Sequence, residues 1–155
     1  MRVGFGVDAH RFGGPGPLRI GGVIIDPVRG VEATSDGDVA IHALIDALLG
    51  AAALGDLGTH FPSSDEQWHG AASLDLLART REMIAVSGYT ILNVDVTVVS
   101  QSVRIAPHRQ AIRTTVSDVL RIEPGCVSIK ATSTDGLGFT GRDEGIAAMA
   151  VAAVR

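Results

Sequence analysis

The longest apolar segment of the chain, residues 38–54, predicts a helix that is buried on almost every side. Most of its positions carry Val, Ile, Leu or Ala, and a helix without a polar face packs inside a protein. Asp38, His42 and Asp46 interrupt it at four-residue spacing. Residues four apart share one helix face, so these three form a narrow polar stripe. Because buried unpaired charge is costly, the stripe predicts a metal ion or an anionic ligand beside it. A core histidine with satisfied hydrogen bonds is the alternative for His42.

The start of this helix also carries a signal. Ser35 can be the N-cap, with Asp38 at the capping-box position three residues later. Gly37 would let a ligand approach the backbone closely, and the free N–H groups of a first helical turn attract anions. Ordinary helices carry the same cap, so a purely structural role is the alternative.

The remaining hydrophobic pattern predicts an α/β protein. The first residues, from Val3 to Asp8, alternate as in a strand, whereas residues 145–154 are Ala-rich and ambiguous between helix and strand. Residues 55–58 form a tight turn, 60–70 an irregular loop and 132–144 a Gly-rich loop. The other predicted elements are a hairpin over 18–25, helices over 72–87 and 107–122, and strands over 89–101 and 127–131.

Two further segments carry candidate chemistry. Asp8 and His10 are two apart, so on a strand they point to one side and offer an oxygen and a nitrogen to a metal. In residues 132–144, hydroxyl groups and free N–H groups can hold phosphate, and Asp135 can bind a hard cation such as magnesium. Short Asp-x-His matches arise by chance, and a plain Gly-rich turn is the alternative for the loop.

Composition narrows the class of protein. The 155 residues fit one domain, 1–155, and low charge with many Ala and Val residues favours an oligomer that hides its surface. The net charge of -4 provides no basic field for nucleic acid. Cys126 is the only cysteine, so neither a disulfide framework nor a thiolate zinc cluster is expected. Without a signal-peptide core or a membrane-length apolar run, we expect a cytoplasmic protein, with a plastid form as the alternative.

Taken in order, four motifs resemble one family across the whole chain. They are D-x-H at 8–10, SDGD-x-x-x-H at 35–42, GD-x-G at 55–58 and T-x-T-D-x-LGFTGR-x-EG at 132–145. The set is similar to the 2-C-methyl-D-erythritol 2,4-cyclodiphosphate synthases, the cyclases of the non-mevalonate isoprenoid pathway. The resemblance implies a single compact α/β domain with a mixed sheet packed by helices on one face. It also implies a homotrimer with sheets around the threefold axis and active sites between subunits.

The resemblance implies a metal-dependent lyase reaction. Asp8, His10 and His42 would bind one zinc ion per subunit and leave a fourth position open. We expect Asp46, one turn beyond His42, to orient an imidazole. The 2-phosphate of 4-diphosphocytidyl-2-C-methyl-D-erythritol 2-phosphate would attack the β-phosphorus and release CMP. Magnesium or manganese, held by Asp135, would bridge the α- and β-phosphates.

The implied substrate contacts come from several segments. Thr134 would join the catalytic set, and Phe139, Arg142 and Glu144 would face a central cavity that can hold an isoprenoid phosphate. The cytidine pocket would come from the neighbouring subunit. Implied contacts to phosphate and methylerythritol are Thr34, Ser35, Asp56, Leu57, Gly58, Phe61, Ser63 and Asp65; those to cytidine are Ser100, Ala106, Lys130, Ala131, Thr132 and Ser133.

Some positions depart from the family pattern. Thr34 stands where the family usually has a histidine that touches the substrate. Asp135 replaces a common Glu, and Val103 replaces a common Pro in the cytidine segment. Asp143 replaces a common Gly and adds negative charge beside Arg142, which would weaken anion binding in the central cavity. Two alternatives stay open: a phosphohydrolase that uses a metal-bound water, and a trimeric nucleotide- or metal-binding module without turnover.

Overall fold

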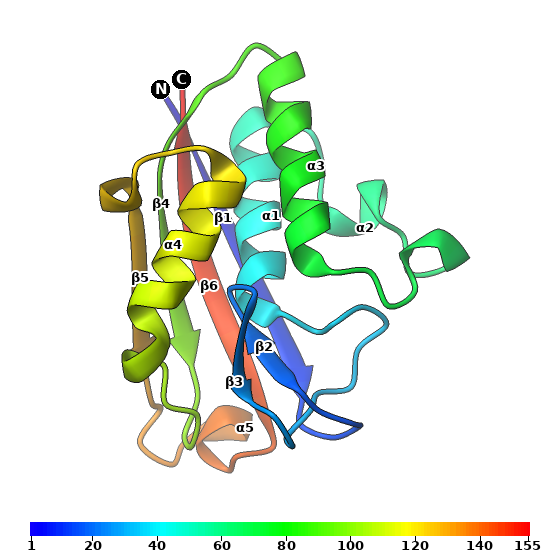
Figure 1. Ribbon diagram of the computed structural model, residues 1–155, viewed down its shortest axis with the longest axis vertical. Helices are drawn as coiled ribbons and strands as arrows, with labels where there is room; N and C mark the ends of the chain where they lie inside the picture. Colours follow the sequence, from blue (N-terminus) through cyan, green and yellow to red (C-terminus); the bar gives the residue numbers. More distant parts are fainter.

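A mixed four-stranded sheet, covered by helices on one face, forms the frame of the protein (Figure 1). The computed structural model describes all residues, 1–155. The strand order is β1-β6-β4-β5, antiparallel except for the parallel β4–β5 pair. The strands are β1 (Arg2–Arg11), β4 (Ile91–Val99), β5 (Val127–Thr132) and β6 (Gly145–Val154), and the long helices are α1 (Val39–Ala52), α3 (Ser73–Val86) and α4 (Arg109–Leu120).

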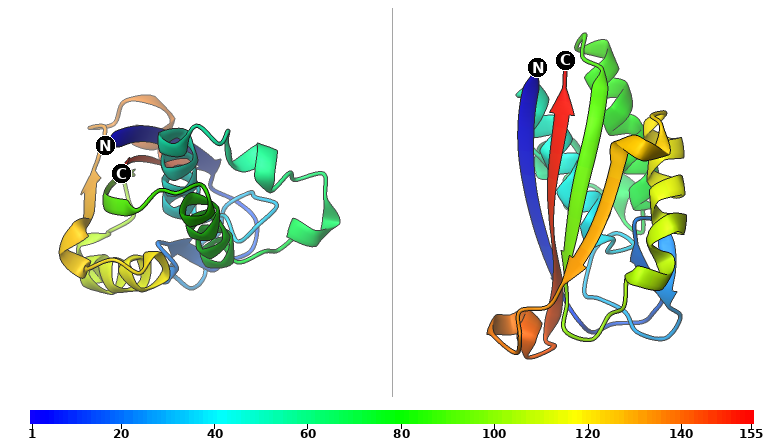
Figure 2. Two further views of the ribbon diagram at one scale, coloured as in Figure 1. Left: turned by 90° about the horizontal axis from the view of Figure 1, so that it is seen from above. Right: turned by 90° about the vertical axis from the view of Figure 1, so that its left-hand side faces the viewer.

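The three long helices lie on the same side of the sheet, as the side view of Figure 2 shows, and the two termini lie together at one end. The core lies between the two layers and includes Leu44, Leu48, Leu77, Ile112 and Ile146, each almost fully buried. No helix has the length and apolar content needed to cross a membrane. The predicted mixed sheet with helices on one face is therefore confirmed.

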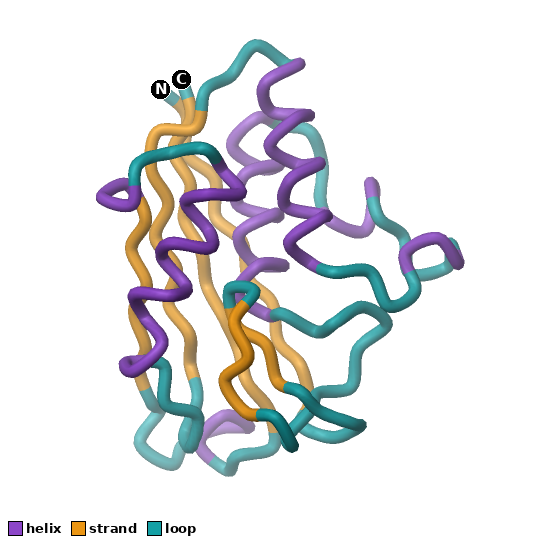
Figure 3. The backbone as a smooth tube through the Cα atoms, viewed as in Figure 1, coloured by secondary structure: helices purple, strands orange, loops and turns teal.

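Most of the shorter elements lie near the end of the sheet opposite the termini or beside the helices, whereas the 3-10 helix Pro124–Cys126 lies between α4 and the start of β5 (Figure 3). A hairpin forms as predicted around Gly21 and Gly22. The predicted tight turn 55–58 leads into a short helix capped by Asp56, and the predicted irregular loop 60–70 contains a 3-10 helix capped by Asp65. The predicted Gly-rich loop 132–144 contains a short helix that begins at Gly138. The shorter elements are β2 (Leu18–Ile20), β3 (Val23–Asp26), α2 (Leu57–His60), α5 (Gly138–Gly141) and the 3-10 helices Glu66–Trp68, Ala106–His108 and Pro124–Cys126.

The Ala-rich segment 145–154, ambiguous in sequence, is the central strand β6. It pairs with β1 on one side and β4 on the other, so both edges of its backbone are hydrogen-bonded. Local preference for a helix gives way to this pairing, and small alanine side chains suit the narrow space beneath α1.

Strand β1 buries its glycines and exposes its large apolar side chains. Gly4 and Gly6 are buried against α1, whereas Val3 and Phe5 are each 62% exposed. A Cβ atom on Gly4 would lie 2.0 Å from the carbonyl oxygen of Ala47. The glycines thus allow the helix axis to approach the strand closely, and the apolar side chains form an open face of the sheet.

Candidate metal centre and substrate site

The carboxylate of Asp8 and the imidazoles of His10 and His42 meet between β1 and α1. Asp8 and His10 lie on the face of β1 that carries Gly4 and Gly6, so both point toward the helix. The Asp8 Oδ2 atom lies 3.0 Å from His10 Nε2 and 3.0 Å from His42 Nδ1. The two nitrogens are 3.2 Å apart. The predicted ligand trio therefore forms one compact group.

This donor set fits a divalent metal ion. Ligand atoms about 2.0 Å from a tetrahedral centre lie about 3.3 Å from one another, close to the three distances in the protein. One carboxylate and two imidazoles are donors that zinc accepts readily. The Asp8 side chain remains 26% exposed, so the trio can be reached from solvent.

Behind His42, two serines bind the nitrogen that faces away from Asp8. His42 Nε2 lies 3.1 Å from Ser35 Oγ and 3.0 Å from Ser73 Oγ. The Ser73 hydroxyl and its backbone N–H in turn donate to Asp36. If Nε2 carries the proton and donates to a serine, Nδ1 is free to bind a metal, which is the usual arrangement for a metal-binding histidine.

Ser73 and Asp36 were not predicted from the sequence. Ser73 is fully buried at the start of α3, 31 residues after His42. No spacing rule links it to His42, since the contact depends on how α3 packs against α1. Asp36 lay inside the recognised motif, and this was the only available signal.

The charges in the trio stabilise one another. Burial by itself would raise the pKa of Asp8, but the hydrogen bonds and charges of His10 and His42 outweigh burial and hold this pKa well below its usual range. Burial would lower the pKa of His42, yet the hydrogen bond and charge of Asp8 raise it. The raised pKa of His42 favours its protonated form beside Asp8, so a bound cation would take the place of that proton.

The three residues of the polar stripe of α1, Asp38, His42 and Asp46, have different hydrogen-bond partners. Asp38, not Ser35, is the N-cap of α1, and it accepts hydrogen bonds from the N–H groups of Ile41, Gly21 and Gly22. These donors compensate its burial only in part, so burial raises its pKa. The proposed capping box at Ser35 is therefore wrong, because the β2–β3 turn supplies donors that only the Asp38 carboxylate reaches.

Asp46 also differs from expectation. Its Oδ1 atom accepts a hydrogen bond from Leu57 N at 2.7 Å, and it makes no hydrogen bond to His10 or His42. The hypothesis that Asp46 orients an imidazole is wrong, because the Gly55–Gly58 turn folds back onto α1 and its Leu57 N–H donates to the carboxylate. Asp46 holds the start of the loop expected to contact methylerythritol.

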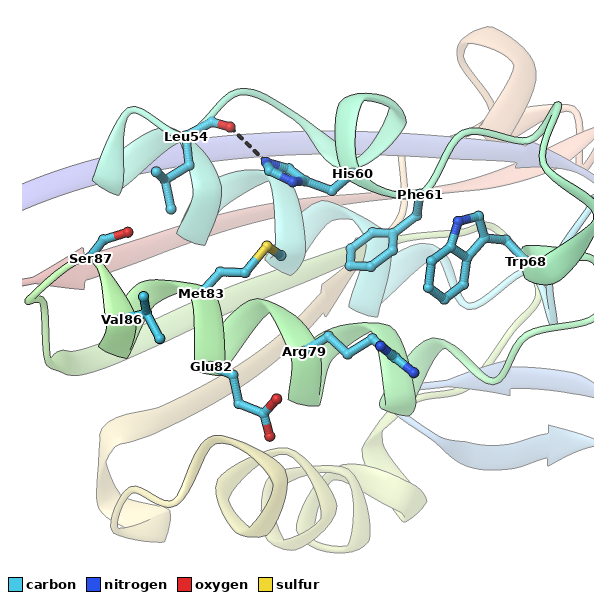
Figure 4. Close-up of a pocket in the computed structure, with 9 residues that line it drawn as sticks. All are labelled: Leu54, His60, Phe61, Trp68, Arg79, Glu82, Met83, Val86 and Ser87. Atoms are coloured by element: carbon cyan, nitrogen blue, oxygen red, sulfur yellow. Dashed lines mark hydrogen bonds between the residues drawn. The ribbon is translucent and has the colours of Figure 1, made fainter.

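That loop is held in place by a helix cap and by two aromatic side chains that line an apolar cavity. Asp56 caps α2 by accepting from Thr59, and this hydrogen bond lowers its pKa. Phe61 is buried edge-on against Trp68, with ring centroids 5.1 Å apart. Both rings line a cavity of about 510 Å³ between the end of α1 and α3 (Figure 4). It shares no residue with the trio, so we assign it to loop anchoring and not to the reacting centre.

The other predicted contacts in this region lie on the surface of the loop. The Thr34 carbonyl accepts from Gly70 N, the Ser63 carbonyl accepts from His69, and Asp65 caps the 3-10 helix that ends at Trp68. Leu57 and Gly58 form the first turn of α2. Leu57, Gly58, Ser63 and Asp65 thus lie in one segment after α1, whereas Thr34 lies before α1 and contacts the end of the loop through Gly70.

Most of the predicted cytidine residues line a second cavity. Its volume is about 270 Å³, and Val103, Arg104, Ile105 and Arg109 complete its wall. The Lys130 side chain points elsewhere and pairs with Asp95 on the open face of the sheet. The residues brought together are Ser100, Ala106, Ala131, Thr132 and Ser133.

The last predicted loop folds into α5 and its flanking turns. Thr134 Oγ1 donates to the Leu137 carbonyl, and Ser133 Oγ donates to Asp135. Asp135 lies outside the metal-ligand group of its own chain. Phe139 and Glu144 line a small cavity that also includes His10, and Arg142 forms a two-point ion pair with Glu144.

Asp143 does not add free charge beside Arg142. Its carboxylate accepts hydrogen bonds from Arg29 and Ser102, and these lower its pKa against the opposing effect of burial. The expected weakening of anion binding in a central cavity therefore lacks its cause, because the charge is already paired.

The fold and the trio define a class of protein: a single α/β domain that can hold one divalent metal ion between a strand and a helix. A family model described as the YgbB family matches residues 1–155, and the chain belongs to this family. A relative from Symbiobacterium thermophilum, named 2-C-methyl-D-erythritol 2,4-cyclodiphosphate synthase, is 54% identical over 154 residues, which cover 99% of this chain and 98% of the relative.

Solved structures agree with this assignment. The bifunctional IspDF from Campylobacter jejuni matches with a TM-score of 0.96 and 38% identity, over 99% of this chain and 42% of that protein. IspF from Plasmodium falciparum, described as a CDP complex, matches with a TM-score of 0.85 and 32% identity. The match covers 99% of this chain and 94% of the Plasmodium chain.

Proposed function

We propose that this protein cyclises 4-diphosphocytidyl-2-C-methyl-D-erythritol 2-phosphate to 2-C-methyl-D-erythritol 2,4-cyclodiphosphate and releases CMP. It is thus a phosphorus–oxygen lyase of isoprenoid precursor synthesis. The observation that carries the proposal is the Asp8, His10 and His42 trio, formed in a chain that matches a named synthase over nearly its full length.

The reaction joins two phosphates that repel each other, so the tasks are neutralisation of charge and in-line placement. Asp8, His10 and His42 would hold zinc, which as a Lewis acid would polarise the β-phosphate. Ser35 hydrogen-bonds His42 and would also contact a phosphate group of the substrate. No side chain needs to act as a nucleophile, because the attacking 2-phosphate is already an anion.

The methylerythritol part would lie along residues 56–65, with the Asp56 carboxylate accepting from its hydroxyls. Asp56 is exposed and held in place by Thr59, and Asp46 fixes the adjacent backbone. Thr34 is exposed at the edge of this segment, where the family usually has a histidine, so it would offer a hydroxyl in place of an imidazole.

The protein would act as a homotrimer, with the open face of its sheet turned toward the threefold axis. This face exposes Val3, Phe5, Val7, Met149 and Val151, an apolar surface that water penalises. The cytidine cavity and Asp135 stand apart from the trio in one chain, so a neighbouring subunit would bring them to it. Asp135 would bind magnesium or manganese on the substrate diphosphate.

Two further expectations belong to this proposal. The trimer axis would enclose a cavity near Phe139 and Arg142 that accepts an isoprenoid phosphate. The protein would work in the cytoplasm, or in a plastid if the chain comes from a plastid-bearing cell. The solved Plasmodium relative in complex with CDP supports a cytidine diphosphate substrate here.

Phosphorus NMR of the zinc-loaded protein with substrate and magnesium tests the reaction. Two coupled cyclic-diphosphate signals with free CMP are expected. Linear hydrolysis products would instead indicate a phosphohydrolase, and an unchanged substrate with confirmed zinc would indicate a binding module. Asp8→Asn is the control: its zinc content and its rate should fall together.

A further inference from the structure

Arg29, Ser102 and Asp143 form a closed ring of hydrogen bonds outside the metal centre. Arg29 Nη1 donates to Ser102 Oγ at 2.6 Å, and Arg29 Nη2 donates to Asp143 Oδ2 at 2.8 Å. Ser102 Oγ donates to Asp143 Oδ1 at 2.7 Å. Each of the three side chains thus contacts the other two, and the charged pair strengthens every bond of the ring.

Arg29 is itself held in place from two sides. Its guanidinium carbon lies 3.5 Å from the centre of the Phe12 ring, which follows the last residue of β1. Its backbone N–H donates to Asp26 Oδ1 at 3.0 Å. Because Arg29 is stacked and tethered, it provides a fixed point for Ser102 and Asp143.

The ring joins three segments that are far apart in sequence. Asp143 follows α5 and precedes β6, Ser102 follows β4, and Arg29 follows β3. These segments lie at the end of the sheet opposite the termini, in the lower part of Figure 1. His10 lies at the same end of the sheet, where it pairs with Ile146 of β6.

Asp143 has a backbone φ of 58°, a left-handed conformation that glycine adopts more easily than other residues. Aspartate is tolerated at a positive φ, but its backbone is no more stable there than that of glycine. The side chain is therefore the part that distinguishes it from glycine, and that side chain makes only the contacts of the ring.

Ser102 lies within the segment that forms the second cavity. Ser100, Val103 and Ala106 line that cavity on either side of it. Within the segment itself, Val103 N donates to Ser100 Oγ at 3.2 Å, and Ser100 N donates to the Thr132 carbonyl at 3.0 Å. Arg29 and Asp143 contact this segment at Ser102, an exposed residue that is not among those lining the cavity.

We propose that Arg29, Ser102 and Asp143 are positioning residues that hold residues 100–106 in the shape needed to bind a cytidine nucleotide. The inference rests on the proposed function for the identity of the ligand. The three side chains do not contact the nucleotide themselves. They limit the motion of the turn, so the cavity is pre-formed and less ordering is needed on binding.

The test compares the wild type with Asp143→Asn, Asp143→Gly and Ser102→Ala. Asn keeps a residue that tolerates a positive φ and removes the charge, whereas Gly relaxes the backbone and removes the side chain. Asp118→Asn, an exposed aspartate on α4, is the matched control. The readouts are CDP affinity by calorimetry, KM and kcat for the cyclisation, and hydrogen exchange of residues 100–106.

Each ring variant should weaken CDP binding and raise KM about tenfold, the order expected from losing a charge-assisted hydrogen bond, with kcat nearly unchanged. Exchange should rise in residues 100–106 and stay constant in α1. Asp118→Asn should match the wild type. Combining Arg29→Met with Asp143→Gly should add little to either single change, because both break one ring.

Unchanged exchange in residues 100–106, or a KM equal to that of the wild type, would overturn the positioning role. A uniform rise in exchange with unchanged KM would also overturn it, because the ring would then serve stability alone. Failure of the wild type to bind CDP would refute the proposed ligand, and the exchange data would still decide whether the ring holds the segment.

Discussion

At the scale of single residues, the metal centre depends on the groups behind its ligands. The Nδ1 atom of His42 faces Asp8 because Ser35 and Ser73 form hydrogen bonds with the other ring nitrogen, Nε2. Asp36 holds Ser73 in turn. An imidazole that can rotate loses entropy when it binds a metal, so we expect these serines to increase metal affinity without contacting the metal.

Ser73→Ala should lower zinc affinity by about tenfold or more, the usual size of such effects. Chelator competition measures the dissociation constant. Ser117→Ala, which removes another buried hydroxyl that donates to a backbone carbonyl in α4, is the control and should leave affinity unchanged. Equal zinc affinity in Ser73→Ala and wild type would show that Ser73 does not orient His42.

Zinc affinity should fall as the pH falls. Asp8 raises the pKa of His42 above its ordinary value of 6.5, and zinc must displace that proton. The loss of affinity should therefore begin above pH 6.5. In the metal-free protein, fold stability has the opposite pH dependence. Protonated His42 paired with ionised Asp8 stabilises the fold below pH 6.5, and this stability is lost as the pH rises through the raised pKa of His42. Dissociation constants measured from pH 8 to pH 5.5 test this, and a flat profile would contradict it.

At the scale of elements, the approach of α1 to β1 decides whether the ligands can meet. The helix lies directly on the glycine face of the strand, where a Cβ on Gly6 would be 2.1 Å from the Ala43 carbonyl oxygen. Asp8 and His10 continue that face, so the same closeness that packs the core also brings them to His42.

Gly6→Ala should destabilise the fold by about 1–3 kcal/mol or more, because α1 must move away from β1. It should also weaken zinc binding, since His42 moves with the helix. Gly50→Ala is the matched control: its Cβ would meet nothing within 4 Å, and alanine favours helix by about 0.5–1 kcal/mol. Denaturant unfolding of both variants measures the effects. A Gly6→Ala protein as stable as the wild type would contradict the close-packing argument.

At the scale of the whole molecule, the two faces of the sheet have different surroundings. Helices cover one face, whereas the other presents apolar residues on β1 and β6 and polar ones, such as Asp95 and Lys130, on β4 and β5. An isolated chain would leave this apolar area in water. Self-association through this face fits the trimer that we propose.

Phe5→Asp should reduce the assembly to a monomer and abolish cyclisation, because it places a charge on the apolar part of the open face. Val86→Asp, at an even more exposed apolar position on α3, should keep the wild-type mass and activity. Sedimentation equilibrium measures the mass. A wild-type mass for Phe5→Asp would show that this face does not form the contact between subunits.

The sequence by itself determined the local features of the protein. Hydrophobic periodicity predicted most helices and strands, because it reflects how often side chains return to the same buried face of an element. Spacing placed Asp8 with His10 on one side of a strand, and the ordered motifs joined them with His42 as candidate metal ligands. These features depend on residues close together in the chain, or on a pattern already known as a set.

Only the tertiary structure decided which groups from distant segments meet. It turned the glycine face of β1 toward α1, and it placed Asp46 where it binds the Leu57 N–H instead of an imidazole. It also paired Asp143 with Arg29, 114 residues away. It also made the Ala-rich segment a strand by placing it between β1 and β4. Such choices follow from how whole elements pack and pair, and a polar side chain binds whichever compensating group the packing brings within reach.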